Sequence, residues 1–192
     1  MERPRDVHRV LDFWFGREDD EDYGKFREAW FQKNDDFDRE VISRFSDLYE
    51  DAASGKLDSW KDDSKSALAL IIVLDQCPRN MFRGDPQSWA TGNKALETAK
   101  HAVEHAFDRE LPPFQRSFVY MPFMHSENLD DQKRCVELFE AMGEDGESNV
   151  EYAVGHMKII EKFGRFPHRN EVLGRQTTPE EAEFLTQPGS SF

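Results

Sequence analysis

Apolar residues recur at helical spacing along almost the whole chain, whereas no segment alternates apolar and polar residues as a half-buried strand does. Val7, Val10, Leu11 and Phe15, for example, lie on one face of a helix that Gly16 ends. Comparable stripes occupy residues 37–52, 95–106, 129–142 and 150–163. The sequence therefore predicts an all-α protein.

Two further helix starts are marked by capping signals. Thr178, Pro179 and Glu181 combine an N-cap, a proline at the first helical position and a capping-box acid. Ser148 and Glu151 have the same capping-box spacing. Together with short connecting loops, these signals predict a stack of about eight antiparallel helices.

The segment Ser66–Leu74 is apolar on every side, which is typical of a helix that is buried all round. Its apolar run, Ala67–Leu74, has eight residues, whereas a bilayer-spanning helix needs roughly 20. The N-terminal residues contain no uninterrupted apolar region of the kind a signal peptide requires. We expect this segment to be the central helix of a protein without a membrane span.

Length and charge limit the classes of function. A chain of 192 residues suits one domain, here residues 1–192, and 16 Phe and four Trp residues supply bulky core material. The net charge of −14 argues against binding to nucleic acids or anionic membranes, because both repel an acidic surface. Cys77 and Cys135 form no disulfide or metal-ligand pattern, so we expect a reducing, cytoplasmic location.

Two segments repeat an unusual combination of residues after apolar helical segments. In LDQCPRNMFRG (Leu74–Gly84) and FGRFPHRNEVLGR (Phe163–Arg175), a proline precedes an Arg-Asn pair and a glycine follows a few residues later. Proline suits a first helical turn, but the helix dipole disfavours cations at that position. Such local conflicts concentrate at functional sites.

Several polar residues also fall on helix faces that are otherwise apolar. His156 lies within the arc formed by Tyr152, Ala153, Ile159 and Ile160. Asp131 and Gln132 lie on the apolar face of the helix over residues 129–142, and Asp75 and Gln76 end the central helix. Buried polar groups need partners, which the two Arg-Asn segments are placed to supply.

Three interpretations of these polar residues stay open at the sequence level. The first is a binding module with a pocket between the central helix and residues 163–175, which would hold a small anionic ligand or a peptide carboxylate. The residues assigned to this pocket are Asp75, Arg79, Asn80, Gln132, Arg165, His168, Arg169 and Asn170.

The second interpretation is a hydrolase or lyase that uses His125 or His156 as the acid or base, oriented by Asp131 or Glu127. The third is a purely structural cluster, in which Asp75, Asp131 and Glu127 pair with Arg79, Arg165 and Arg169. No spacing matches a metal-ligand motif, and we predict neither a metal nor a cofactor. The sequence leaves the oligomeric state open.

Seven features of the sequence occur together: VLDFWFG, LDQCPRNMFRG, YMPFMHSE, the Asp131-Gln132 pair, GHMKIIEKFGRFPHRNEVLGR, TPEEAEFL and the terminal GSSF. In this combination the chain resembles a bacterial family, domain-of-unknown-function family 924, over nearly its whole length. The resemblance implies an all-α fold similar to tetratricopeptide-repeat proteins, although no repeat of about 34 residues is readable. It implies no established reaction, cofactor or substrate. Cys77 stands where the family pattern has an apolar, usually aromatic, residue.

Overall fold

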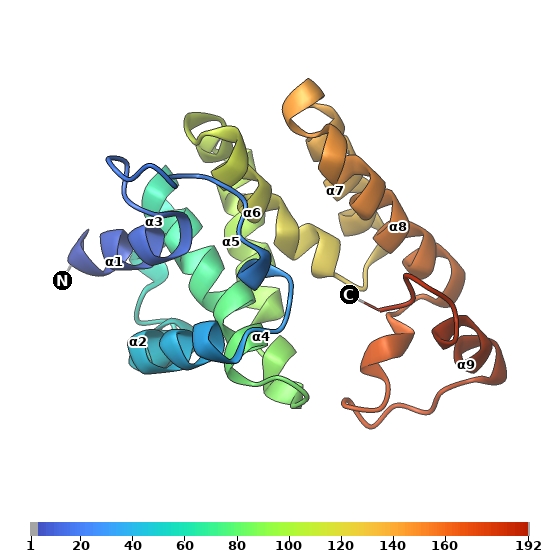
Figure 1. Ribbon diagram of the computed structural model, residues 1–192. Helices are drawn as coiled ribbons and strands as arrows, with labels where there is room; N and C mark the ends of the chain where they lie inside the picture. The colour runs from blue at the N-terminus through green and yellow to red at the C-terminus, as the bar shows by residue number, and fades with distance from the viewer. Residues whose placement is uncertain (1–3, 192) are drawn as a thin grey trace. The chain divides into compact units, whose positions relative to one another are not determined.

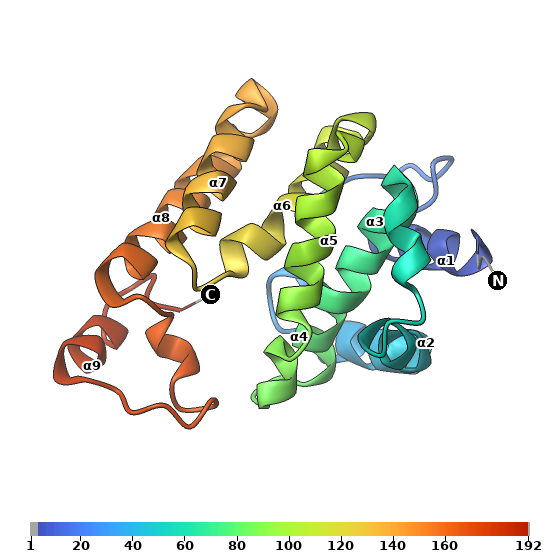
Figure 2. The same cartoon turned by 180° about the vertical axis from the view of Figure 1, so that it is seen from behind.

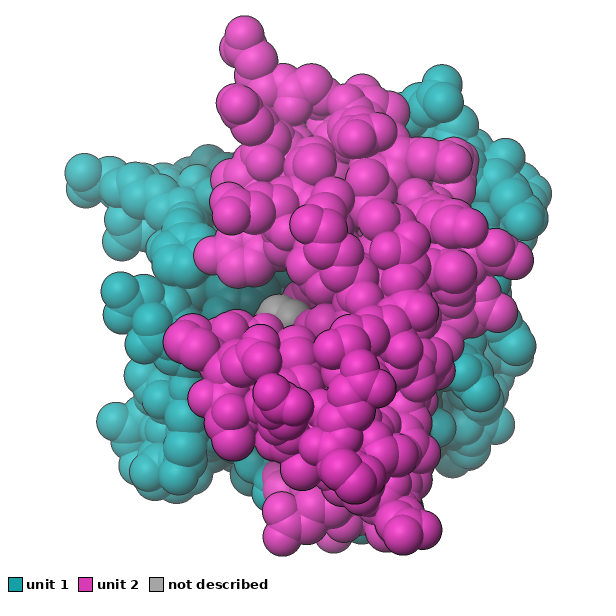
Figure 3. Space-filling view, turned by 90° about the vertical axis from the view of Figure 1, so that its right-hand side faces the viewer, with its two compact units in different colours: residues 1–83, 87–122 teal, residues 84–86, 123–192 magenta. Residues whose placement is uncertain are grey.

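The computed structural model describes residues 4–191, so residues 1–3 and 192 of the predicted domain lie outside the described part (Figure 1). No β-strand occurs among residues 4–191, which confirms the all-α class. By their contacts, the residues form two compact units that are coloured separately in Figure 3. Unit 1 is residues 1–83 and 87–122, and unit 2 is residues 84–86 and 123–192. The expectation of a single domain therefore stays a prediction.

The helices of unit 1 are built around the apolar segment that the sequence places at the centre. The bounds are α1 (Pro4–Phe15), α2 (Asp35–Ala53), α3 (Ser64–Ile71), α4 (Cys77–Met81), α5 (Gly92–Glu104) and α6 (Pro113–His125). The last three residues of α6, 123–125, belong to unit 2. Every residue from Ala67 to Leu74 is buried, as predicted. Helix α3 packs on α1 and α5, and α2 packs on α4.

One turn of π-helix, η3 (Ile72–Gln76), joins α3 to α4 in a continuous helical segment. Pro78 has no N–H, so the usual hydrogen bond to the carbonyl of Leu74 is absent, and the proline ring would crowd that carbonyl. The helix widens instead: the N–H of Cys77 donates to the carbonyl of Ile72, and the Thr91 hydroxyl donates to the Leu74 carbonyl. The π turn thus follows from the proline of the first Arg-Asn segment.

Short 3₁₀ helices lie in the connections between the longer helices of both units. They are η1 (Glu28–Trp30), η2 (Asp58–Asp62), η4 (Pro86–Trp89), η5 (Phe107–Glu110), η6 (Gly143–Asp145) and η7 (Pro167–Arg169). Helix α5 ends at Glu104, earlier than the predicted stripe, because Ala106 has a φ of 58° and begins the turn into η5. The apolar character of Ala106 was therefore a misleading signal.

Unit 2 contains α7 (Leu129–Glu140), α8 (Glu147–Phe163) and α9 (Pro179–Leu185). Helices α7 and α8 run side by side in opposite directions (Figures 1 and 2). Ile159, Ile160 and Phe166 form a buried apolar cluster against which Leu129, Phe163 and Phe184 pack. The antiparallel stacking of neighbouring helices is present here, while the tetratricopeptide-like arrangement stays a prediction.

The capping signals had different outcomes. Thr178 and Glu181 form the predicted capping box at α9. The capping box predicted at Ser148 and Glu151 was wrong, because α8 begins at Glu147 and its N-cap, Gly146, has no side chain to supply a hydrogen bond. Tyr152, predicted to face the core, is 65% exposed.

Candidate functional site

Glu127 lies in the loop after α6 and hydrogen-bonds to the second Arg-Asn segment, residues 163–175. Both belong to unit 2. One carboxylate oxygen accepts hydrogen bonds from the Phe166 N–H at 2.8 Å and from Arg175 at 3.0 Å, and the other accepts from Arg175 at 2.7 Å. Burial alone would raise the pKa of Glu127, but the hydrogen bonds from Arg175 and Phe166 outweigh it and lower that pKa. Glu127 is therefore a paired carboxylate.

Glu181 is a second paired carboxylate, only 2% exposed. Arg165 donates two hydrogen bonds to its carboxylate, of 2.7 and 2.9 Å, and also donates to the Gln176 carbonyl. The Asn170 amide and the Thr178 N–H donate to Glu181 as well. The hydrogen bond from Arg165 is the main reason that the pKa of Glu181 falls to about 2.

Arg169 is 7% exposed and lies against the Phe166 ring, with its guanidinium carbon 4.3 Å from the ring centroid. Its Nη1 donates to the His125 carbonyl at 3.1 Å. His168 is half-buried, and its ring centroid is 5.7 Å from that of Phe166. Phe166 is thus the apolar centre around which several of the predicted polar residues lie.

The polar start of α7 is explained largely by capping. The Asn128 side chain accepts hydrogen bonds from the N–H groups of Asp130 and Asp131. The Ser126 hydroxyl donates to the Asp131 carboxylate at 2.8 Å. Gln132 is fully buried, and its amide nitrogen reaches the carbonyls of Phe123, Met124 and Ser126. These contacts hold the start of α7 against the end of α6 and the loop between them.

His156 lies within the core of unit 2, 5% exposed, beside the Phe166 ring. Its Nδ1 is 2.8 Å from the Tyr152 carbonyl oxygen, and because a carbonyl only accepts, Nδ1 carries the proton. Burial is the main cause that lowers the pKa of His156 to about 3. The imidazole is therefore neutral at physiological pH.

We call these side chains the unit 2 polar network. It contains most of the residues that the sequence singled out: His125, Glu127, Asp131, Gln132, His156, Arg165, His168, Arg169 and Asn170. The salt bridges of this network join Glu127 to Arg175 and Arg165 to Glu181, partners that the sequence did not assign. The charges of Arg165 and Arg169 still act on Glu127 without forming its salt bridge. The sequence did not assign Arg175 or Glu181 to this network. Glu181 did have a capping-box signal, and a carboxylate that caps a helix can also accept hydrogen bonds from an arginine.

The remaining predicted residues belong to the first Arg-Asn segment, in unit 1. Asp75 is 1% exposed and accepts a hydrogen bond from the adjacent Gln76 amide at 2.7 Å. The same amide nitrogen is 3.4 Å from the Met121 sulfur. Arg79 lies 3.4 Å from Asp75, one helical turn away, which confirms the predicted Asp75–Arg79 pairing.

Asn80 connects α4 to α2 rather than extending this pair. Its amide donates to the buried Asp38 carboxylate at 2.7 Å, and Arg83 donates to both oxygens of Asp38 at 2.6 and 2.9 Å. Burial opposes ionisation of Asp38, but the hydrogen bonds from Arg83 and Asn80 prevail and lower its pKa. Asp38 and Arg83 were missed because they lie far from each other in sequence.

The two Arg-Asn segments therefore have similar chemistry within their own units: each supplies cations and an amide to a buried carboxylate. The expectation that both segments line one pocket stays a prediction. So do the individual ligand-binding and catalytic roles assigned from the sequence.

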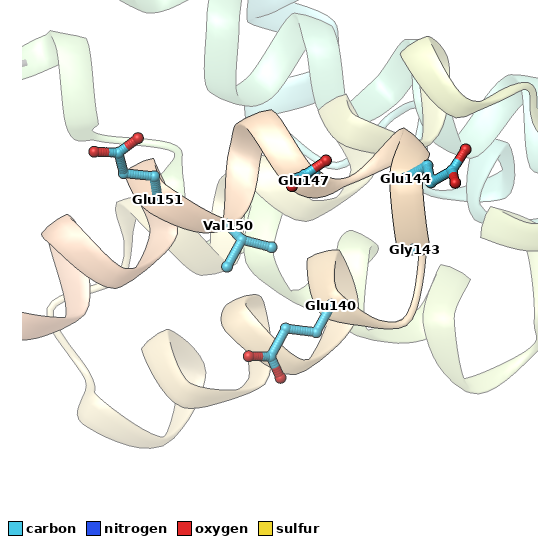
Figure 4. Close-up of a pocket in the computed structure, with 6 residues that line it drawn as sticks. All are labelled: Glu140, Gly143, Glu144, Glu147, Val150 and Glu151. Atoms are coloured by element: carbon cyan, nitrogen blue, oxygen red, sulfur yellow. The ribbon is translucent and has the colours of Figure 1, made fainter.

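A separate hollow lies where α7 and α8 meet η6 (Figure 4). It is lined by Glu140, Gly143, Glu144, Glu147, Val150 and Glu151. Four carboxylates line it, and none of the residues that the sequence assigned to a binding or catalytic site does. Within residues 4–191, no group of three or more metal-ligating side chains has an arrangement suited to a metal ion. None of the helices in that range is long and apolar enough to cross a bilayer.

The fold and these contacts define an all-α protein in which the two Arg-Asn segments supply partners to buried carboxylates. Residues 10–189 match the family described as bacterial protein of unknown function (DUF924), and the chain belongs to this family. The solved structure of a protein of unknown function from Agrobacterium tumefaciens is similar, with 37% sequence identity and a TM-score of 0.83. The match covers 93% of this chain and 96% of that one. No curated protein gives a significant match.

Proposed function

We propose that the protein is a binding module for an anionic ligand, a small molecule or a peptide carboxylate, and that Arg79 is the main contact. One observation carries this proposal: Arg79 is 27% exposed, yet its contact with Asp75 is a single long one of 3.4 Å. The Nε of Arg79 is buried and has no hydrogen-bond partner among the described residues. The buried Nε–H is out of reach of a ligand, but the terminal N–H groups that are not directed at Asp75 are unpaired within residues 4–191, and these are the donors we propose for the anion.

The comparison with the other arginines supports the choice of Arg79. Arg165 and Arg175 each hold a glutamate through two short hydrogen bonds and also donate to a backbone carbonyl. An anion that bound to either would have to compete with a carboxylate already in place. Arg79 offers a guanidinium that a buried acid orients without saturating it, which suits bidentate recognition of a carboxylate or phosphate.

The surroundings of His156 favour binding over acid–base catalysis at that residue. His156 is enclosed beside Phe166, and its pKa of about 3 leaves it a weak base. Asp131 accepts from the Ser126 hydroxyl within a capping arrangement. These are contacts of a kind that stabilises a helix start, so they give the hydrolase or lyase alternative no specific support.

The proposal is tested by titration calorimetry of the full chain with inorganic phosphate, citrate, and an acetylated peptide in two forms. One peptide form has a free C-terminal carboxylate and the other is amidated. We expect binding of at least one anion, weakened about tenfold or more in Arg79→Lys, because an ammonium cannot replace a bidentate fork. Preference for the free peptide over the amidated one would identify a terminal carboxylate as the ligand group.

The matched control is Arg109→Lys, which changes an exposed arginine of the same unit and should bind as the wild type does. Equal affinities of the Arg79→Lys variant and the wild type would overturn the proposal, and so would the absence of binding by every anion tested. Circular dichroism of each variant checks that the helices are retained.

A further inference from the structure

The segment between α1 and α2, which can be followed in Figure 1, carries aromatic side chains that are exposed to solvent. Phe26 is 70% exposed and Phe31 is 56% exposed, and the two rings are stacked, with centroids 5.8 Å apart. Trp30 lies beside both, with ring centroids 6.2 Å away in each case. We call Phe26, Trp30 and Phe31 the aromatic surface.

This surface is supported from below. The indole N–H of Trp30 donates to the Trp14 carbonyl at 3.1 Å, and its ring packs edge-on against Phe118 at 5.0 Å. Arg27 donates to the Phe13 carbonyl at 2.8 Å, which ties the segment to α1. The segment that carries the exposed rings is therefore held against the core of unit 1 by hydrogen bonds to α1 and by ring packing on Phe118.

The segment that carries the aromatic surface is acidic overall. Residues 17–36 contain eight Asp or Glu and four Lys or Arg, a net charge of −4. Residues 18–22 (EDDED) are all acidic and all exposed. Glu28, Asp35 and Asp36 are exposed as well. Some of these carboxylates pair with nearby cations, as Asp22 does with Lys25 and Asp35 with Lys33, but the segment keeps a net negative charge that a partner of the rings would meet.

From this combination we infer that the aromatic surface is a docking site for a basic amphipathic peptide segment. Leucine-type side chains would cover Phe26 and Phe31, and the Lys or Arg side chains would meet the surrounding carboxylates or lie over the rings. Exposed aromatic patches rimmed by charge are typical of interaction sites. Electrostatic complementarity selects the sign of the partner.

Two other occupants of an exposed apolar patch fit the charge less well. An anionic membrane would be repelled by a chain whose net charge is −14. A second copy of the chain would bring two acidic rims together, which costs free energy through like-charge repulsion. Both alternatives remain distinguishable from the inferred partner by their response to salt.

The experiment uses the full chain and a fluorescent synthetic peptide with Lys and Arg on one helical face and Leu at i, i+3, i+4 and i+7 on the other. Acetylated and amidated ends remove terminal charges, so the result does not depend on anion binding at Arg79. We expect binding measured by fluorescence anisotropy to weaken about tenfold in Phe26→Ser and in Phe31→Ser. It should also weaken as salt is added, and less steeply in Glu28→Gln.

The matched control is Tyr152→Ser, which removes an aromatic ring of intermediate exposure, 65% against 70% for Phe26 and 56% for Phe31, from unit 2 and should leave binding unchanged. Unchanged binding in both Phe variants would overturn the inference. So would self-association that strengthens with salt and disappears in Phe31→Ser, which would assign the surface to a second copy. Binding to anionic phospholipid vesicles through the same rings would also overturn it, in favour of a membrane.

Discussion

At the scale of single residues, buried polar groups in this protein are accommodated by partners that lie close in sequence as well as by distant ones. Gln132 illustrates the first case, since its amide nitrogen reaches carbonyls only six to nine residues away. Its Oε1 is buried and has no hydrogen-bond partner among the described residues. A buried acceptor of this kind is a suitable position for an ordered water molecule.

The pH response of His156 belongs to the same scale. Its pKa of about 3 in the folded state lies below the ordinary histidine value of about 6.5, so between these pH values the unfolded chain binds more protons. His156 therefore contributes stability that is fully present above about pH 6.5 and is lost as pH falls. The slope for one proton is about 1.4 kcal/mol per pH unit.

We predict that His156→Gln reduces the fall of the unfolding free energy between about pH 6 and pH 5 by up to this slope. Urea unfolding followed by circular dichroism at several pH values measures it. His105→Gln, at the exposed histidine that caps the C-terminus of α5, should retain the wild-type pH dependence. A His156→Gln profile parallel to that of the wild type would contradict this account.

At the scale of secondary-structure elements, the π turn is the least regular feature of the fold. Pro78 removes the backbone donor that would serve the Leu74 carbonyl, and the Thr91 hydroxyl supplies a donor from the start of α5. π turns occur frequently at functional sites. Here the turn contains Asp75, the acid that orients Arg79.

We predict that Thr91→Val destabilises the protein by about 1–2 kcal/mol, because a buried carbonyl loses a hydrogen-bond donor while the side-chain shape is retained. Thermal and urea unfolding measure the change. Thr98→Val is the matched control: Thr98 is also buried, but its hydroxyl donates to the Lys94 carbonyl within α5, where the helix itself provides a donor. Equal decreases in the free energy of unfolding of the two variants would show that the hydrogen bond from Thr91 to the Leu74 carbonyl contributes no more stability than the one within α5.

At the scale of the whole molecule, carboxylates with lowered pKa values occur in both units. Asp38 belongs to unit 1, whereas Glu127 and Glu181 belong to unit 2. Because these pKa values are lower in the folded state than in the unfolded chain, the pairs stabilise the protein above about pH 4. This stability is lost as pH falls through the folded-state pKa values.

Glu127→Gln tests this origin of acid sensitivity. The amide cannot form a charged pair with Arg175, so we expect a loss of about 1–3 kcal/mol at neutral pH and a shallower decline of stability below about pH 4. The control is Glu137→Gln, which breaks an exposed pair with Arg134 and should change stability by less than about 1 kcal/mol. An equally small effect at Glu127 would argue that its pair contributes no net stability.

Some features of the fold and the site were predictable because they depend on local pattern. The all-α class, the buried helix over residues 67–74 and the capping box at Thr178 follow from periodicity and from short-range hydrogen bonding. The burial of His156 and Gln132 follows from their place on apolar faces. The wrong capping box at Ser148 shows the limit of such signals, because a matching spacing does not require that the helix begin there.

What the sequence determined by itself is the helical composition, the buried central segment and the set of polar residues that need partners. Only the tertiary structure decided which partners they have: Glu127 with Arg175, Glu181 with Arg165, and Asp38 with Arg83. The physical reason is that a helix face is encoded by residues three or four positions apart, whereas a salt bridge between distant segments depends on how the helices pack. That packing also left Arg79 with a single weak contact, which is the basis of the proposed anion-binding role.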